Sequence, residues 1–484
     1  MDARELASSG RDAGENRSII AILLVAAFVV ILNETTMNVA LSRIMGSFGV
    51  TERAAQWLTT AFMLTMAVVI PVTGWLLERL HTRTVFTLAM SLFSAGTAIA
   101  ALAPTFEVLL GARIVQASGT AVMMPLLMTT VMQLVPEKGR GQMMGNISMV
   151  ISVAPAVGPT LSGVLLQLGS WRYIFAFVLP IALAILALGR LKLRNANVPR
   201  PVPLDGWSIP LTVVAFGPLV YGLSLIGNPL VPTWQPVVAL GMGVAGLGAF
   251  IARQFVLQAR DRAFLDLRTF RIGSFRIAVT MMAIGMMALF GTIIMLPLLL
   301  QQVYGLEPLQ VGLMMLPGGL LMGVLGPIVG RLYDRVGPRV LVAPASLVIL
   351  AVFVGFSMLT PSTPWWLVMV GHMLMSASFA FTFTPLFTVA LGGLPGRLIS
   401  HGSAMLGTIQ QVAGAAGTAL FVTIFAMQTD AAASGGAGHA VAMLRGSHWA
   451  FLGAGAVWVL AVAASLLLRK PDEVGTGTGG HPAH

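Results

Sequence analysis

Charge is what this sequence has least of. Only 9% of its 484 residues are Asp, Glu, Lys or Arg, whereas soluble globular domains carry about 25%. The hydrophobic fraction is 57%, and apolar stretches of 18 to 25 residues recur along the whole chain between short charged segments. This pattern excludes a soluble globular protein and predicts an all-α integral membrane protein, a bundle of membrane-spanning helices.

Cysteine is absent altogether. Its absence excludes disulfides, a thiol nucleophile and any Cys-ligated zinc or iron-sulfur site. The seven His residues are scattered without a helical His-pair motif, so we expect no metal and no other cofactor. Neither a nucleophile and base pair nor a GxxxxGK[ST] phosphate loop is present, which disfavours an enzyme and direct use of ATP. We also expect no cleavable signal peptide, because the first 17 residues are polar and the apolar run after them is too long.

Fourteen apolar runs are long enough to cross a bilayer. An even number of spans puts both chain ends on one side. The predicted spans are 19–41, 57–77, 84–103, 108–132, 142–168, 173–191, 207–225, 234–253, 276–303, 310–332, 340–359, 365–391, 402–427 and 449–468.

The distribution of basic residues gives the orientation. With both ends in the cytoplasm, 23 Lys and Arg residues fall inside, four fall outside, and Arg113 lies within a span. This obeys the positive-inside rule. The net charge of +11 is therefore an orientation signal facing anionic lipid headgroups, and we expect no nucleic-acid partner. The four outer residues are Arg43, Arg53, Arg172 and Arg445.

Two segments repeat each other, GWLLERLHTR at 74–83 and GRLYDRVGPR at 330–339. Each follows an even-numbered span and places an acid and an Arg four and five residues after a Gly. Their separation fits a six-helix repeat plus a two-helix insertion. We therefore predict four parts: an N-terminal six-helix bundle (1–200), a linker with an inserted hairpin (201–262), a C-terminal six-helix bundle (263–470) and a disordered cytoplasmic tail (471–484). Within them, the Pro-rich stretch at 198–203 is the linker and 259–271 is an interfacial segment.

These motifs resemble those of the major facilitator superfamily, and within it the 14-helix drug:proton antiporters. The two repeated segments are similar to the loop signature between helices 2 and 3 and its second-half counterpart. LLGARIVQASGTAVMMP (109–125) resembles the helix 4 signature, and APAVGPTLSGVL (154–165) the antiporter signature of helix 5. LNETTMNVAL (32–41), QWLTTAFMLTMAVVIPVTGWL (56–76) and MMPLLMTT (123–130) are similar to the lincomycin-resistance branch of multidrug exporters.

The resemblance covers the chain except its tails and implies two six-helix pseudo-repeat bundles plus a two-helix insertion. It implies proton-coupled multidrug efflux by alternating access across a bacterial cytoplasmic membrane, by a monomer. Some positions depart from the pattern and put the gating detail of the first loop in doubt. Glu78 stands where Asp is usual, His81 and Thr82 replace a Gly-Arg step, and Ala117 and Ser162 replace Gly.

One acid stands out on physical grounds. Of the 17 acidic residues, Glu34 alone lies well inside an apolar run, where a carboxylate must be neutral, paired or facing water. At about 1.5 Å per residue it lies roughly 10 Å from the outer end of its span, and Arg113 lies about 8 Å below the outer surface. The matching depths predict that Glu34 and Arg113 can meet inside the bundle, and our hypothesis is that they couple export of the cargo to proton uptake.

Two alternatives stay open. Glu34 and Arg113 could form a fixed buried ion pair that only locks two helices together, and Arg113 could have a purely structural hydrogen-bonding role. We favour a Glu34 that loads a proton outside and releases it inside, since opposed effects of burial and a nearby cation allow a carboxylate to change protonation as water access changes sides.

Small residues and clusters of charged residues suggest where the two halves seal and separate during transport. By resemblance, Gly158, Pro159 and Gly163 form a bend that seals the interface between the halves against proton leak, although small residues also serve ordinary helix packing. By the same resemblance, two clusters are latches on the inner side, and their alternative is plain cytoplasmic anchoring. The clusters are Glu78, Arg79 and Arg83, and Asp334, Arg335 and Arg339.

The cargo is less constrained. The 29 Met residues suggest a pliable apolar cavity, and a cavity with one acid should favour lipophilic neutral or monocationic compounds. A major-facilitator transporter of a physiological metabolite or lipid is the alternative, and a non-transporting sensor is improbable. His372 is expected to be a packing residue. Candidate cargo contacts are Asn33, Asn38, Gln116, Phe381 and Gln410.

Overall fold

The structure is a computed structural model that describes residues 3–226 and 231–470. Within helices, the side chains of residues 3–14, 38, 52, 53 and 308 lie outside this description, as does the predicted tail at 471–484. The helices are α1 (Ala3–Phe48), α2 (Glu52–Arg79), α3 (Thr82–Leu102), α4 (Phe106–Leu134), α5 (Glu137–Gln167), α6 (Arg172–Lys192), α7 (Ser208–Leu225), α8 (Trp234–Gln258), η1 (Leu267–Arg271), α9 (Gly273–Gln302), α10 (Pro308–Val336), α11 (Pro338–Phe356), α12 (Trp365–Gly392), η2 (Gly396–Leu398), α13 (Ile399–Ser434) and α14 (His439–Ser465).

The prediction of fourteen spans is confirmed. Across the described residues, fourteen helices are long and apolar enough to cross a membrane. Helices are the natural outcome, because a backbone in hydrocarbon must satisfy its hydrogen bonds within the segment. Large apolar side chains on the outer surface, among them Leu191, Val237 and Val340, therefore face lipid. Trp207, Trp234 and Trp365 are exposed next to helix starts, where amphipathic rings match the membrane interface.

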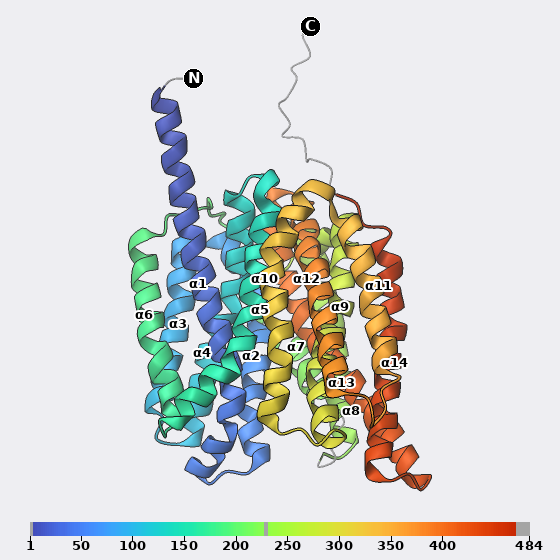
Figure 1. Cartoon of the computed structure of the whole chain (residues 1–484). Coiled ribbons are helices and arrows are strands. Elements are labelled where there is room, and N and C mark those ends of the chain that lie inside the picture. The colour runs from blue at the N-terminus through green and yellow to red at the C-terminus, as the bar shows by residue number, and fades with distance from the viewer. Residues whose placement is uncertain (1–2, 227–230, 471–484) are drawn as a thin grey trace.

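The helices stand side by side in one bundle (Figure 1). Helices α1 to α6 pack mainly on one another, and so do helices α9 to α14; we call these two groups the halves, and they meet along two seams, α5 against α10 and α2 against α13. The inserted α7 pairs with α8 and also packs on both α2 and α13. The insertion therefore lies against the line where the two halves meet.

Helices α1, α13 and α14 extend furthest beyond their predicted spans, and α14 begins at His439, ten residues before the predicted start. Helix α1 begins at Ala3, well before the apolar stretch, and its first turns project past the bundle (Figure 1). Helix α13 continues to Ser434. Ala, Glu and Arg are strong helix formers, so the helix continues where hydropathy alone would end a span. We call the end of the bundle where α1 begins and α14 ends the inner end.

A cluster of hydrogen bonds at the inner end connects α7, α8 and the segment that follows them. Arg253 of α8 donates two hydrogen bonds, of 2.9 and 2.6 Å, to the carboxylate of Asp205, which lies just before α7. Gln254 is fully buried; its amide donates to the Ser208 hydroxyl and accepts the backbone N–H groups of Phe264 and Leu265. These hydrogen bonds join α8 to α7, and they also join α8 to the segment at 259–271 that leads into α9.

Candidate functional site

The predicted proton site lies between α1 and α4. Glu34 on α1 is half-buried, and Arg113 on α4 is only 1% exposed. The two side chains interact electrostatically, as the matching depths predict. No ion pair within 4.0 Å and no hydrogen bond engages the Glu34 carboxylate among the described residues. In this conformation Glu34 lies near Arg113 but forms no ion pair with it within 4.0 Å. The structure therefore does not contain the fixed Glu34–Arg113 ion pair of the alternative interpretation.

Arg113 is held by other partners. Its guanidinium carbon lies 4.0 Å from the ring centroid of Phe62 on α2. Its Nη1 donates to the side-chain oxygen of Gln116 at 2.5 Å, and the Gln116 amide donates to the Thr97 hydroxyl on α3 at 2.8 Å. The Nε of Arg113 has no partner in the structure. One N–H of a buried guanidinium is therefore free to bind an acceptor near Glu34.

The predicted cargo residues have different environments. Asn33 is 1% exposed, and neither its amide nitrogen nor its oxygen has a partner. Gln410 on α13 is half-buried with an unpaired amide nitrogen, and Phe381 on α12 is half-buried. Gln116 belongs to the Arg113 network. The side chain of Asn38 lies outside the described part of the chain.

His372 lies in a helix contact, which agrees with a packing role. A Cβ at Gly318 of α10 would lie 2.4 Å from its Nδ1, so the ring presses against the backbone of the neighbouring helix. Its Nδ1 is buried without a partner.

The stretch of α5 that resembles the antiporter signature faces α1. A Cβ at Gly158 would lie 2.1 Å from the Thr35 hydroxyl, and Ser162 donates to the backbone carbonyl of Thr36 at 2.8 Å. Pro159 is exposed, and Gly163 has open space around it. The signature thus brings α5 against the helix that carries Glu34, within one half; the seal between halves stays a prediction.

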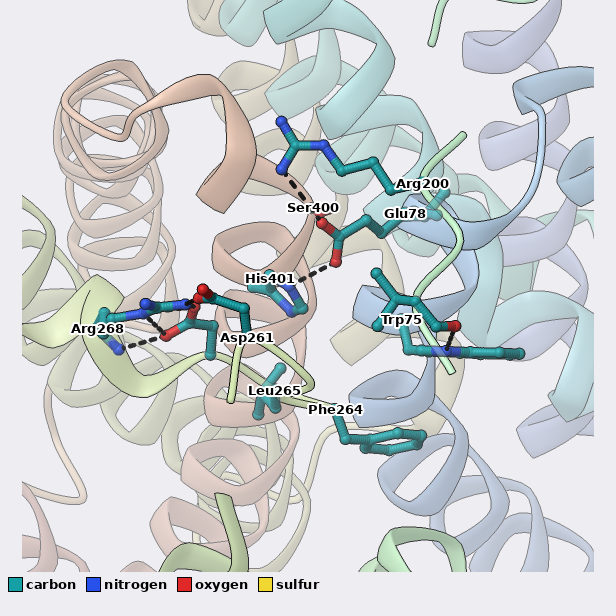
Figure 2. Close-up of polar contacts among 12 residues, drawn as sticks. Trp75, Glu78, Arg200, Asp261, Phe264, Leu265, Arg268, Ser400 and His401 are labelled. Atoms are coloured by element: carbon teal, nitrogen blue, oxygen red, sulfur yellow. Dashed lines mark hydrogen bonds and ion pairs between the residues drawn. The ribbon is translucent and has the colours of Figure 1, made fainter. Parts of the chain in front are cut away.

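Glu78, Arg79 and Arg83 form the first of the two predicted latch clusters. This cluster contacts the other half through His401 (Figure 2). The Glu78 carboxylate at the end of α2 accepts a hydrogen bond from Nε2 of His401 on α13 at 3.0 Å. Its other oxygen lies 3.7 Å from Nη1 of Arg200 in the linker. Arg79 donates to the carbonyl of Val202 at 3.3 Å, and Arg83 donates to the carbonyl of Arg190. Only Glu78 of this cluster reaches across to the second half; both arginines bind within their own half and linker.

The second latch cluster mirrors the first. Asp334 at the end of α10 accepts the backbone N–H groups of Gly141 and Gln142 on α5, at 3.0 and 3.1 Å. Each half therefore sends one carboxylate onto a helix of the other. Arg335 and Arg339 are exposed and form no hydrogen bond or ion pair among the described residues.

The inner end is closed. Thr129 and Ser403 share a hydrogen bond of 2.7 Å between α4 and α13, and Thr384 of α12 donates to Ser148 of α5 at 2.9 Å. Together with the Glu78 and Asp334 contacts, these are the side-chain hydrogen bonds between the halves in the described chain, and all lie toward the inner end.

Close glycine packing completes the closure along α5 and α10. A Cβ at Gly145 would lie 2.2 Å from the carbonyl oxygen of Gly326. A Cβ at Gly330 would lie 2.1 Å from that of Gly141. Backbones approach this closely only where side chains are missing.

Sequence reasoning missed Phe62, Thr97 and His401. Phe62 is an aromatic residue in an apolar run, a pattern without any chemical signal. Thr97 is equally ordinary. His401 lies just before the predicted span 402–427, and its partner Glu78 is 323 residues away in the sequence, so no local spacing connects them.

The fold and its polar sites can be compared with known proteins. The family model described as Major Facilitator Superfamily matches residues 23–418. The chain belongs to the major facilitator superfamily. It is a multi-pass membrane transporter, not an enzyme.

Relatives place the chain near drug-resistance proteins. It is 39% identical over 459 residues to the MFS-type transporter YcnB of Bacillus subtilis, covering 95% of this chain and 96% of YcnB. It is 35% identical over 410 residues to the lincomycin resistance protein LmrB of Bacillus subtilis, covering 84% and 85% of the two chains. The solved structure of the human organic anion transporter MFSD10 shares the fold, with a TM-score of 0.68 over 93% of this chain and 99% of that chain at 16% identity.

Proposed function

We propose that this transporter exports lipophilic neutral or monocationic compounds in exchange for protons by alternating access. The observation that carries the proposal is Glu34. It is a half-buried acid inside the membrane with no hydrogen bond or ion pair among the described residues, and Arg113 is close enough to interact electrostatically. An intramembrane acid in this setting is functional by default.

The coupling follows from the chemistry of one carboxylate. A protonated Glu34 is neutral, and a deprotonated Glu34 is an anion that attracts the free N–H of Arg113 or a cationic cargo. Proton and cargo then exclude each other at the same place, which is the requirement for exchange. The unpaired amides of Asn33 and Gln410 offer hydrogen bonds to neutral cargo.

The cycle treats residues 1–200 and 263–470 as two halves that rock, with both termini in the cytoplasm as the basic residues indicate. The present conformation, closed at the inner end, is then the one that receives protons from outside. Similarity to lincomycin resistance proteins supports a drug-like cargo, and we infer that both latch clusters open when the halves rock.

The experiment is a transport assay in proteoliposomes with an imposed pH gradient. The native chain and a Glu34→Gln variant are compared on a panel of lipophilic cations, neutral drugs, lincosamides and anionic drugs. We expect pH-driven movement of cations and neutral compounds by the native chain, its loss with a protonophore, and no pH-driven movement by Glu34→Gln.

Folding has to be separated from coupling. Glu34→Gln keeps size and polarity, so it should insert and elute as the native chain does, and it should retain passive exchange of cargo down its own gradient. Full pH-driven transport by this variant would refute the assignment of Glu34. Transport only of a metabolite or lipid by the native chain would refute the cargo class.

A further inference from the structure

His401 is buried exactly where the halves close. Its side chain is 4% exposed, and its ring packs against α2, because a Cβ at Gly74 would lie 3.1 Å from Nδ1. Nε2 contacts the Glu78 carboxylate at 3.0 Å. The ring therefore fills the α2–α13 seam at the inner end.

The two ring nitrogens have different states. A carboxylate only accepts hydrogen bonds, so the hydrogen in the contact with Glu78 is on Nε2. Nδ1 is buried and has no hydrogen-bond partner in the structure. A further proton would therefore bind at Nδ1 and turn the neutral imidazole into a cation without breaking the contact with Glu78.

A second carboxylate, that of Asp266, also interacts with His401. Asp266, 3% exposed, lies in the segment that leads into η1 and interacts electrostatically with His401. Burial alone would raise the pKa of the Asp266 carboxyl, but hydrogen bonds from Arg268 and the charges of His401 and Arg268 hold that pKa below its ordinary value. Asp266 is therefore an anion at neutral pH.

The other charged groups around the ring are accounted for. Arg200 lies beside Glu78, and its side chain is 59% exposed, so solvent screens its charge. Arg268 is bound to Asp266 and Asp261, and Figure 2 shows Arg268 beside Asp261. His401 is the third residue of α13, where the positive end of the helix opposes a cation, while the carboxylates of Glu78 and Asp266 favour one. No other charged side chain in the described residues forms a hydrogen bond or ion pair with His401.

We propose that His401 is a proton-dependent positioning residue of the inner gate. With a cytoplasmic proton on Nδ1, His401 is a cation that holds the carboxylate of Glu78 on α2 against α13, and the inner end stays closed. Without that proton the neutral imidazole still donates to the Glu78 carboxylate, but the attraction between opposite charges is lost, and the inner end opens more readily. Opposite charges attract each other more strongly at a buried site than in water.

This assignment adds a response to cytoplasmic pH that Glu34 does not supply. If the proposed antiport is correct, each turnover brings protons in, and an acidified cytoplasm would keep the inner gate closed and slow further proton entry. The gate itself does not depend on the cargo or on antiport, so it can be tested without either.

The test measures the distance across the inner end as a function of pH. The chain has no cysteine, so Lys138→Cys and Gly396→Cys supply the only two thiols for labelling. Both positions are exposed, and one lies in each half. Spin labels on this pair, in lipid nanodiscs without drug or gradient, report closed and open populations by pulsed electron paramagnetic resonance. Every sample also carries Glu34→Gln, which removes the other proton site.

Between pH 5.5 and 8.5 we expect the open-to-closed ratio to rise by about tenfold, because loss of one proton from His401 weakens the closed state relative to the open one. His401→Gln keeps an N–H donor for Glu78 but cannot bind the proton, so its ratio should not change with pH. His372→Gln is the matched control, a second buried histidine with an unpaired Nδ1, and should keep the rise.

Each outcome decides the assignment. A flat ratio in the Glu34→Gln background, a rise that persists in His401→Gln, or a rise that His372→Gln also removes overturns it. If His401→Gln does not fold, Glu78→Gln replaces it: loss of the rise supports the assignment, and its persistence overturns it. Failure of drug transport in the proteoliposome assay leaves these results untouched, because no cargo is present.

Discussion

The ring of Phe62 on α2 lies under the guanidinium of Arg113 on α4, with 4.0 Å between the guanidinium carbon and the ring centroid. Both side chains are 1% exposed. The ring face supplies the negative electrostatic potential that a buried cation needs. Arg113 can therefore remain a cation beside Glu34 without a direct ion pair. Phe62 is in this sense a positioning residue for the predicted proton site.

Phe62→Leu should weaken coupling. The substitution removes the ring but keeps an apolar side chain, and a desolvated cation–π contact is worth about 2 kcal/mol. With Arg113 less well held, we expect the rate of pH-driven transport in proteoliposomes to fall by up to about thirtyfold. Phe62→Tyr keeps a ring face and should retain most of the rate. Equal rates for Phe62→Leu and the native chain would show that the ring does not position Arg113.

The sequence predicts the number of membrane-spanning helices well, because each span needs a long apolar run that can be seen in the sequence. It also predicts that Glu34 and Arg113 are neighbours, because both lie in helices whose depth follows from counting residues. It does not predict what surrounds them. Phe62 carries no local chemical signal, and the Glu78 to His401 contact depends on how two halves of the chain pack, which residue spacing does not encode.

Gly145→Ala should open the inner end. The added Cβ would lie 2.2 Å from the Gly326 carbonyl oxygen, so α5 and α10 must separate, and overpacking of this kind costs about 1–3 kcal/mol. We expect the spin-label pair at residues 138 and 396 to shift toward its longer distance. Gly163→Ala is the control on the same helix, since nothing lies within 4 Å of its added Cβ. A native distance distribution for Gly145→Ala would contradict the importance of this contact for closure.

The ion pair between Asp205 and Arg253 should make a pH-dependent contribution to the free energy of unfolding. Two hydrogen bonds from Arg253 hold the pKa of the Asp205 carboxyl below its ordinary value, although burial acts against them. Because the folded-state pKa is depressed, the stabilisation is present above the ordinary aspartate pKa, near 4. It is lost as the pH falls through the folded-state value.

Asp205→Asn should therefore melt at a lower temperature than the native chain at pH 7, and the two melting temperatures should converge as the pH falls below about 4. Asp261→Asn is the matched control: its carboxylate is 76% exposed and bonded to Arg268 alone, and exposed pairs contribute only about 0–1 kcal/mol. Thermal unfolding of purified protein in detergent measures the difference. A gap between Asp205→Asn and the native chain that does not change with pH would exclude this pairing as its source.

Gln254→Leu should release the segment that carries Asp266. The substitution leaves the N–H groups of Phe264 and Leu265 without their acceptor, and a buried unsatisfied group costs about 1–3 kcal/mol. We expect faster hydrogen–deuterium exchange at 263–268, and a smaller pH response of the inner gate, because Asp266 would no longer be held beside His401. Gln301→Leu, at an exposed position near the end of α9, should leave exchange at 263–268 unchanged. Unaltered protection of this segment in Gln254→Leu would mean that other contacts hold it, and that the insertion does not position the gate.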